Sequence, residues 1–167
     1  FCFLFSTSIG ENIRFYNSSH TQAEVEKAAK MASVYNDVIE FPDGFDTVVG
    51  ERGITLSGGQ KQRVSIARAI IKDPSILILD DSLSAVDTKT EEEILGNVQA
   101  VLQNRTGIII AHRISTIKHA DQIIVLDKGQ IIEQGSHSEL LAKKGYYTRL
   151  YNLQLAESDF HKRVDAV

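Results

Sequence analysis

The chain has 167 residues, of which 43% are hydrophobic and 24% charged, and these values predict a single globular domain with a substantial apolar core. Its formal net charge of −4 argues against nucleic-acid binding, which favours a basic surface. No apolar run approaches the roughly 20 residues that a membrane-spanning helix needs, and a single cysteine, Cys2, excludes a disulfide framework within the chain and agrees with a reducing cytosolic setting.

The first residues indicate a piece cut from a longer protein. The chain opens Phe1-Cys2-Phe3-Leu4-Phe5, without an initiator methionine and without the basic flank of a signal peptide. We therefore expect that further sequence precedes it.

Two short helices are predicted in the first third of the chain. Thr21 is placed to cap the first helix, with Glu24 three residues on to complete a capping box, and helical spacing continues to about Ser33. The second helix includes residues 34–39 and ends at the turn signal Phe41-Pro42-Asp43-Gly44. From periodicity alone, the region is a small helical hairpin that serves only for packing.

The run Leu56-Ser57-Gly58-Gly59-Gln60 leads directly into a segment with helical periodicity. Its two glycines remove side chains that would keep a phosphate away from the backbone, and Ser57 adds a hydroxyl. A helix start carries unpaired N–H groups and about half a positive charge, so it attracts anions. A serine N-cap on an ordinary surface helix explains the motif at least as well, so the motif needs support from elsewhere in the chain.

Two adjacent carboxylates follow a short apolar run. Residues 76–79 are apolar and rich in isoleucine, and this pattern predicts a strand buried on both faces of a parallel sheet. The carboxyl end of this strand brings Asp80 and Asp81 to the edge where α/β proteins bind ligands. Charges at the end of a buried strand are costly unless they hold a cation or handle a proton, so the pair favours a functional role.

A further helix and strand lie between these carboxylates and a histidine. Asp87 is predicted to cap a helix over residues 88–103, after the turn Ser84-Ala85-Val86. Residues 106–111 form the next predicted buried strand, and His112 leaves its carboxyl end. An isolated histidine is more often a structural hydrogen-bonding residue, although an imidazole can also donate to an oxygen and change charge near neutral pH.

The last third of the chain predicts a hairpin followed by helices. Strands over residues 123–127 and 130–133 are joined at Lys128-Gly129, where glycine can adopt a positive φ. A short serine-capped helix precedes a longer helix over residues 146–156, whose tyrosines indicate core packing rather than a binding site. After residue 157 the sequence turns polar, and we expect disorder there.

Taken together, these motifs resemble the ATPase domains of ABC transporters. Residues 56–60 are similar to the family's signature, Asp80 to its Walker B aspartate, residues 84–87 to its D-loop and His112 to its H-loop histidine. They occur in the family's order and at its usual spacing, and the resemblance covers nearly the whole chain. This combination is far more specific than any of its parts.

Two further segments resemble the exporters of this family. Phe3-Leu4-Phe5-Ser6 is similar to the phrase that follows the Q-loop glutamine, and residues 47–53 are similar to the X-loop near the coupling helices. Glu51 and Arg52 in that loop are equally well explained as a solvated charge pair of little energetic weight. The largest departure from the family is the missing Walker A motif, since no G-x-x-x-x-G-K-[ST] occurs. The chain alone is therefore expected to bind ATP poorly or not at all.

The resemblance implies an α/β fold. We expect a P-loop NTPase-like parallel sheet flanked by helices, with an attached α-helical subdomain, truncated at the N-terminus. Residues 1–72 would hold the segment after the Q-loop, the helical subdomain and the signature helix. Residues 73–157 would form the C-terminal part of the RecA-like ATPase core, and residues 158–167 a polar tail.

The resemblance also implies a function for the intact protein, namely the ATP-hydrolysing domain of a drug or lipid exporter at the cytoplasmic face of the membrane. Its implied partners are a second nucleotide-binding domain, in a homodimer or heterodimer, and the transmembrane domains. The implied cofactors are ATP and Mg²⁺. Asp80 would hold the metal, Asp81 would act as general base, and His112 would contact the γ-phosphate. The implied nucleotide contacts are Ser57, Gly58, Gly59, Gln60 and Asp87.

Asp81 departs from the family pattern, because most competent members have glutamate at this position. Aspartate is one methylene shorter, and a carboxylate drawn back by about 1 Å can cost on the order of 10²-fold in rate. In heterodimeric exporters, the subunit with aspartate here tends to retain a good signature, and residues 56–60 are intact. We hypothesise that this chain lends its signature to a partner's active site while its own site turns over slowly.

Two alternatives stay open at this stage. A soluble ABC ATPase of DNA-repair or translation type shares the signature and Walker B, but is not expected to carry the exporter-like segments. A non-catalytic module that only presents the signature helix to a partner agrees with the missing Walker A. Upstream membrane-spanning segments would favour the exporter, a coiled-coil insertion the repair protein, and a true start at Phe1 the binding module.

Overall fold

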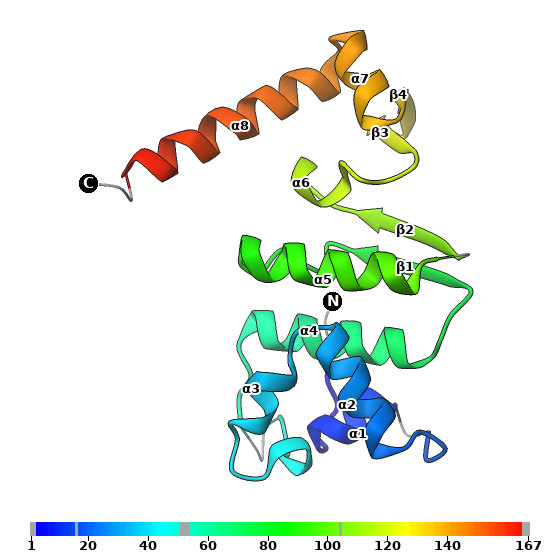
Figure 1. The fold of residues 1–167 in the computed structure, drawn as a ribbon, viewed down its shortest axis with the longest axis vertical. Coiled ribbons are helices and arrows are strands. Elements are labelled where there is room, and N and C mark those ends of the chain that lie inside the picture. The colour runs from blue at the N-terminus through cyan, green and yellow to red at the C-terminus, as the bar shows by residue number, and fades with distance from the viewer. Residues whose placement is uncertain (1–2, 16, 51–53, 104, 165–167) are drawn as a thin grey trace. The chain divides into compact units, whose positions relative to one another are not determined.

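The computed structural model describes residues 3–15, 17–50, 54–103 and 105–164, with side chains described as far as residue 157. Cys2, Glu51 and Arg52 lie outside the described residues. The chain divides into two compact units, residues 1–110 and 111–167, whose helices and strands are drawn in Figure 1. Among the described residues, none of the helices combines the length and apolar character needed to cross a membrane.

The first unit begins with short helices. They are α1 (Ile9–Arg14), α2 (Gln22–Met31), α3 (Tyr35–Ile39) and a single 3₁₀ turn, η1 (Gly44–Asp46). The Thr21 hydroxyl oxygen accepts the Glu24 amide, and the Glu24 carboxylate accepts the Thr21 amide. The predicted capping box is therefore confirmed, although α2 ends two residues before the predicted Ser33.

Helix α4 (Gly58–Ile71) packs against both α1 and α2 (Figure 1). Arg68 on α4 donates to the backbone oxygen of Asn12 over 2.8 Å, to its side-chain oxygen over 2.8 Å, and to the carbonyl of Phe3 over 2.9 Å. Asn12 is completely buried. These bonds fix the start of the chain onto α4.

A parallel pair of strands completes the first unit. Strand β1 (Ile76–Asp80) pairs with β2 (Thr106–Ile110), and α5 (Thr88–Val101) connects them. This strand–helix–strand order, with a parallel register and helices packed beside it, confirms the predicted α/β class.

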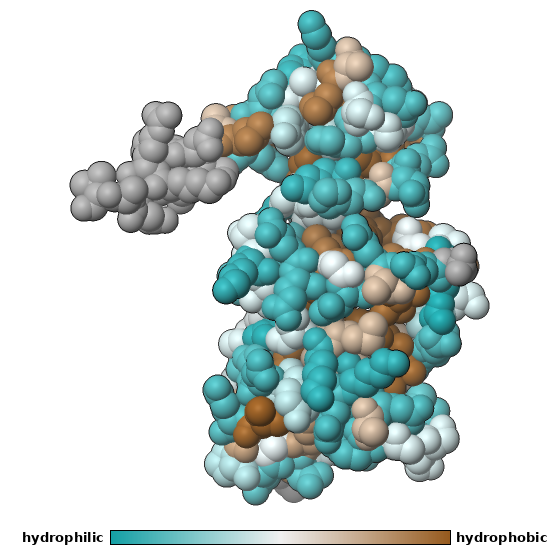
Figure 2. All heavy atoms as spheres, viewed as in Figure 1, coloured by the Kyte–Doolittle hydropathy of each residue, from teal (hydrophilic) through white to brown (hydrophobic). Residues whose placement is uncertain are grey.

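The prediction that β1 is buried on both faces is wrong for this chain. Leu77 and Leu79 point into the core, whereas Ile76 and Ile78 are each 58% exposed, and most of β2 is exposed as well. The described sheet has only these two strands, and the helices of the unit cover one of its faces. Figure 2 shows hydrophobic side chains that reach the surface among hydrophilic ones.

The second unit is built around a β-hairpin. Its elements are α6 (Ile114–Ile117), β3 (Ile123–Asp127), β4 (Gln130–Gly135), α7 (His137–Lys143) and α8 (Tyr146–Val164). The turn residues Lys128 and Gly129 have φ angles of 47° and 76°. Positive φ at both positions is what a type I′ turn requires, so the predicted hairpin is confirmed.

Tyr147 belongs to the hydrophobic core of the second unit. It is only 2% exposed and packs with Ile114, Ile123 and Leu140. Its hydroxyl lies 2.7 Å from Nδ1 of His137. The structural interpretation of the tyrosines is confirmed at this position, and burial raises the pKa of the Tyr147 hydroxyl.

The expectation of disorder after residue 157 is wrong as far as Val164, because α8 continues to that residue. The carboxylate of Glu133 accepts the amides of Tyr146 and Tyr147 at the start of α8, over 2.5 and 3.0 Å. Starting a helix is the costly step and extending it is easy, so an anchored first turn supports a helix that runs past its packed part.

Candidate functional site

The predicted signature lies at the start of α4. The Ser57 hydroxyl oxygen accepts the Gln60 amide, and the Gln60 side-chain oxygen accepts the Ser57 amide. The amides of Gly58 and Gly59 belong to the same first turn, where a helix offers no intrahelical acceptor for them. Ser57 and Gly58 are exposed, so this positive helix end is open to an anion.

Asp37 in α3 holds this helix start in place. Its carboxylate accepts the side-chain amide of Gln60 over 3.1 Å and two N–H groups of Arg63 over 2.7 and 3.0 Å. Burial opposes the charge on Asp37, but the hydrogen bonds from Arg63 and Gln60 outweigh that cost and hold the pKa of its carboxyl below the ordinary value. A bidentate arginine pair of this kind fixes direction as well as distance.

The two glycines of the signature pack against Ala85. A Cβ added to Gly59 would come within 2.9 Å of the Ala85 carbonyl oxygen, and one added to Gly58 would lie 3.4 Å from the Ala85 Cβ. The sequence analysis explains both glycines by the approach of a phosphate. At Gly59 the structure gives a second reason, which is the close approach of the backbone inside the chain itself.

Asp80 and Asp81 lie at the carboxyl end of β1, as predicted, and both are exposed. Because water reaches them, the expected desolvation cost does not arise, and the fold does not require a cation there. Asp81 has a φ of 47°, in the left-handed region that aspartate tolerates better than most residues. Its amide donates to the carbonyl of Ile110 over 3.0 Å.

Within the described ranges, no group of three or more histidine, cysteine or acidic residues is arranged to hold a metal ion. Magnesium usually takes only one or two carboxylates, together with water and substrate phosphates. An exposed Asp80 at the end of a strand fits such a partial ligand set.

Gln62 connects α4 with the segment after β1. Its side-chain nitrogen donates to the Ser84 hydroxyl over 3.0 Å and to the Asp81 carbonyl over 3.3 Å, and its side-chain oxygen accepts the Ala85 amide over 2.9 Å. Gln62 is only 9% exposed. The signature helix and the predicted D-loop are thus joined through one buried amide.

Asp87 caps α5, as predicted. Its carboxylate accepts the amide of Thr90 over 3.0 Å, and hydrogen bonds from Thr90 hold the pKa of Asp87 below the ordinary value. The residue is exposed.

His112 belongs to the second unit and is exposed. Gln154 on α8 donates to the His112 carbonyl over 2.8 Å and accepts the Ile114 amide over 2.9 Å. The backbone on both sides of Arg113 is thereby fixed to α8, whereas the imidazole itself stays open to solvent.

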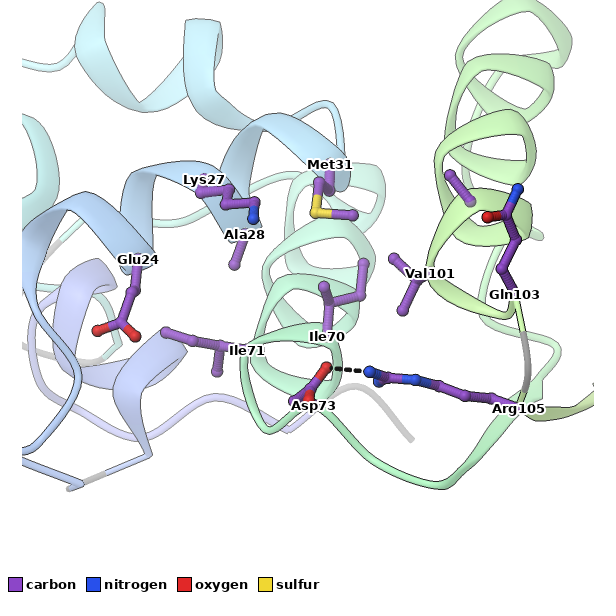
Figure 3. A pocket seen from close by; sticks show the side chains of 11 residues that line it. Glu24, Lys27, Ala28, Met31, Ile70, Ile71, Asp73, Val101, Gln103 and Arg105 are labelled. Carbon is purple, nitrogen blue, oxygen red and sulfur yellow. Dashed lines mark ion pairs between the residues drawn. The ribbon is translucent and has the colours of Figure 1, made fainter.

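A separate pocket of about 510 Å³ lies between α2, α4 and α5. Figure 3 shows its lining side chains, including the ion pair between Asp73 and Arg105, with an N–O distance of 2.6 Å. Ile70 and Ile71 contribute the last turn of α4. The pocket is therefore at the opposite end of α4 from Ser57 and contains none of the predicted site residues.

Comparison with known proteins supports the family resemblance that the sequence motifs indicate. A family model described as "ABC transporter" matches residues 3–84. The ABC transporter ATP-binding protein YknU of Bacillus subtilis, described as uncharacterized, is 55% identical over 152 residues, which is 91% of this chain and 26% of that protein. The ATP-dependent lipid A-core flippase of Desulfotalea psychrophila is 50% identical over 151 residues, or 90% of this chain and 26% of that protein.

A solved structure shows the same fold. It is described as a bacterial Atm1-family ABC exporter with ATP bound, and it matches with a TM-score of 0.86 and 49% identity over 91% of this chain and 27% of that one. The chain belongs to the ABC transporter family. This ABC transporter chain spans about a quarter of the length of the relatives it matches, and its fold is that of an exporter's nucleotide-binding domain.

Three side-chain contacts around the predicted site residues escaped the sequence analysis. Asp37 and Arg63 are 26 positions apart, and Gln62 and Ala85 are 23 apart, so no helical or strand spacing rule relates them. Gln154 and His112 are separated still further, by 42 positions. The only available signal was polar character at positions expected to be buried, such as Gln62 among the apolar residues of α4.

Proposed function

We propose that this chain is the part of an ABC exporter's ATP-hydrolysing domain that carries the signature, Walker B, the D-loop and the H-loop. In the intact protein, ATP would lie between the Walker residues of one domain and residues 57–60 of a second. Closure of that pair would drive transmembrane domains at the cytoplasmic face of the membrane, and hydrolysis would reset them. A drug-like or lipid-like cargo would be recognised by membrane segments outside this chain.

The observation that carries this proposal is the contact between two motifs. The signature at the start of α4 packs directly on Ala85, and Asp81 lies in the same hydrogen-bonded cluster through Gln62. An open helix N-terminus suits a phosphate, and carboxylates at the end of a parallel strand suit the metal and water of phosphoryl transfer. The match to an ATP-bound exporter structure supports the same conclusion.

Each site residue then has a role. Asp80 would hold Mg²⁺, commonly through water, and the bound ion would neutralise charge on the phosphates. Asp81 would orient the attacking water and accept its proton, and His112 would donate to the γ-phosphate. Ser57, Gly58, Gly59 and Gln60 would contact the nucleotide held by the partner domain, and Asp87 would lie where the two domains meet.

We also propose that this chain's own ATP site is slow. Asp81 replaces the usual glutamate, and its shorter side chain draws the carboxylate back from the water it must orient. Its left-handed backbone suits aspartate, since glutamate is found there less often. An intact signature beside a weakened base is the combination expected of the degenerate partner in a heterodimer.

The test starts with binding of Mg-ATP, measured by calorimetry on this chain and on the full-length protein that contains it. Binding by the full-length protein alone supports the proposal. Binding by neither would contradict ATP binding altogether. Tight binding by this chain would contradict the proposal that the phosphates are held mainly by a Walker A motif outside it.

The slow site is tested by hydrolysis in the full-length protein, assembled with its partner subunit if it has one. We expect Asp81→Glu to raise the rate by roughly tenfold or more and the exposed control Asp43→Asn to leave it unchanged. Rapid hydrolysis by the unmodified homodimer, with little gain from Asp81→Glu, would rule the slow site out. A rate that does not respond even to Asp81→Asn would favour the module that only presents its signature.

A further inference from the structure

Both ends of the Gln62 side-chain amide are hydrogen-bonded to one segment, residues 81–85. One end donates to Ser84 and to the carbonyl of Asp81, and the other accepts the amide of Ala85. The Ser84 hydroxyl in turn donates to the Asp81 carbonyl over 3.1 Å. The donors and acceptors match in only one orientation of the amide, because reversing it would set its NH₂ group against the N–H of Ala85.

This arrangement fixes the backbone of Asp81 on both sides. Its N–H is held by Ile110 on β2, and its C=O is held by Gln62 and Ser84. Since Asp81 adopts a left-handed φ of 47°, its conformation depends on neighbours that hold it there. The direction of the Asp81 side chain follows from that of its backbone.

We propose that Gln62 is a positioning residue that makes the Asp81 carboxylate and the D-loop follow the signature helix. This inference rests on the proposed function, in which the signature contacts one ATP molecule and Asp81 acts on another. Gln62 is then a rigid link inside one chain between the parts that serve two ATP sites. A displacement of α4 on nucleotide binding is carried to Asp81 through a buried amide rather than through a flexible loop.

A purely structural role would predict something different. A buried glutamine that only satisfies neighbouring polar groups would affect the stability of the unit when replaced, with hydrolysis falling only as far as folded protein is lost. A positioning role predicts a loss that is confined to the reaction step performed with Asp81. The structural and the positioning role of Gln62 can be distinguished by measuring the part of the ATP hydrolysis rate that depends on Asp81.

The experiment uses the full-length protein and defines the Asp81-dependent rate as the wild-type rate of ATP hydrolysis minus that of Asp81→Asn. Gln62→Met keeps the length and removes the hydrogen bonds, and Gln62→Glu keeps an acceptor for Ala85 but loses both donations. Gln99→Met, on the exposed side of α5, is the matched control. Hydrogen exchange of the segment 82–87 and thermal unfolding are followed in parallel.

We expect Gln62→Met to lower the Asp81-dependent kcat by about tenfold, with the KM for Mg-ATP changed less than about twofold. Added to Asp81→Asn, it should have little further effect, because residues that act as a unit are not additive. The Ala85 amide should exchange faster in Gln62→Met and stay protected in Gln62→Glu, while both variants lose the Asp81-dependent rate. Gln99→Met should match the wild type in all of these measurements.

Equal losses from Gln62→Met in the wild-type and Asp81→Asn backgrounds would overturn the positioning role, as would a loss that only tracks unfolding. Unchanged exchange at Ala85 in Gln62→Met would overturn the link itself, and this readout does not depend on activity. If the full-length wild type hydrolyses no ATP, it is the proposed function that fails, and the exchange measurement still decides whether Gln62 holds the segment.

Discussion

The α-carbon of Gly59 faces the carbonyl oxygen of Ala85 so closely that a Cβ would come within 2.9 Å of it. The signature and the D-loop of one chain are therefore in direct backbone contact. Glycine at this position serves the fold of the chain as well as any ligand. The two explanations for the paired glycines can be separated by experiment.

Gly59→Ala is expected to destabilise the first unit by about 1–3 kcal/mol, because a backbone carbonyl cannot move aside as a flexible side chain can. In Gly58→Ala the added Cβ lies 3.4 Å from the Cβ of Ala85, which is an ordinary van der Waals contact. This variant should therefore be as stable as the wild type. If a phosphate must approach this backbone, Gly58→Ala should still weaken nucleotide-dependent dimerisation. Urea unfolding and ATP-dependent association of the full-length protein measure the two effects.

Gly96→Ala is the control for the glycine series, since an added Cβ at this position in α5 meets nothing within 4 Å. It should stabilise the helix by up to about 1 kcal/mol. Gly59→Ala with wild-type stability would show that the contact with Ala85 yields easily, and the packing explanation would then be wrong.

Asp37→Asn is expected to destabilise the protein at pH 7 by roughly 1–3 kcal/mol, between the values for exposed and buried ion pairs. The Asp37 side chain is 27% exposed and that of Arg63 is 14% exposed. Hydrogen bonds from Arg63 and Gln60 outweigh the cost of burial and depress the pKa of Asp37 in the folded state. The contribution of Asp37 to the free energy of unfolding is therefore complete above its pKa in the unfolded chain, about 3.9. This contribution is lost as the pH falls through the lower pKa that Asp37 has in the folded protein.

The difference between wild type and Asp37→Asn should therefore shrink as the pH falls below about 4, which chemical unfolding over a pH series measures. Asp43→Asn, at an exposed position in the same unit, should differ little from wild type at any pH. A difference for Asp37→Asn that stays constant down to about pH 2 would show that charge is not the source of the stabilisation.

Asp87 combines a cap with a proposed position between two domains, and serine can separate these roles. Serine is as good an N-cap as aspartate, so Asp87→Ser should keep the melting temperature while Asp87→Ala lowers it. If the carboxylate meets the partner domain, both variants should lose ATP hydrolysis to a similar extent, on the order of tenfold. Full activity in Asp87→Ser would limit the residue to its capping role.

The sequence was a good guide to local structure. The capping box of Thr21 and Glu24, the start of α4 at Ser57, the cap at Asp87 and the turn at Gly129 all follow from neighbours within four residues. Such bonds form whenever the local backbone forms, so residue type and spacing are enough to predict them. The order of the motifs also identified the family before any contact was known.

Burial was predicted less well. The apolar run of β1 suggested a strand covered on both faces, yet Ile76 and Ile78 are exposed. Apolar character shows that a strand is suited to burial, but whether it is buried depends on which elements lie beside it. In the same way, exposure of Asp80 and Asp81 removes the desolvation argument that first drew attention to them.

The sequence by itself determined the capped helix starts, the turn of the hairpin and the strand–helix–strand order, and it proposed which residues have the chemistry for nucleotide and metal. Only the tertiary structure decided how those residues are held. Asp37 forms hydrogen bonds with Gln60 and Arg63, and Gln62 forms them with Asp81 and Ala85. Gln154 forms a hydrogen bond with the backbone of His112. The physical reason is the range of the interactions. Caps and turns join residues a few positions apart, whereas these side-chain bonds close loops of more than 18 residues, and their partners become neighbours only once the helices and strands have packed.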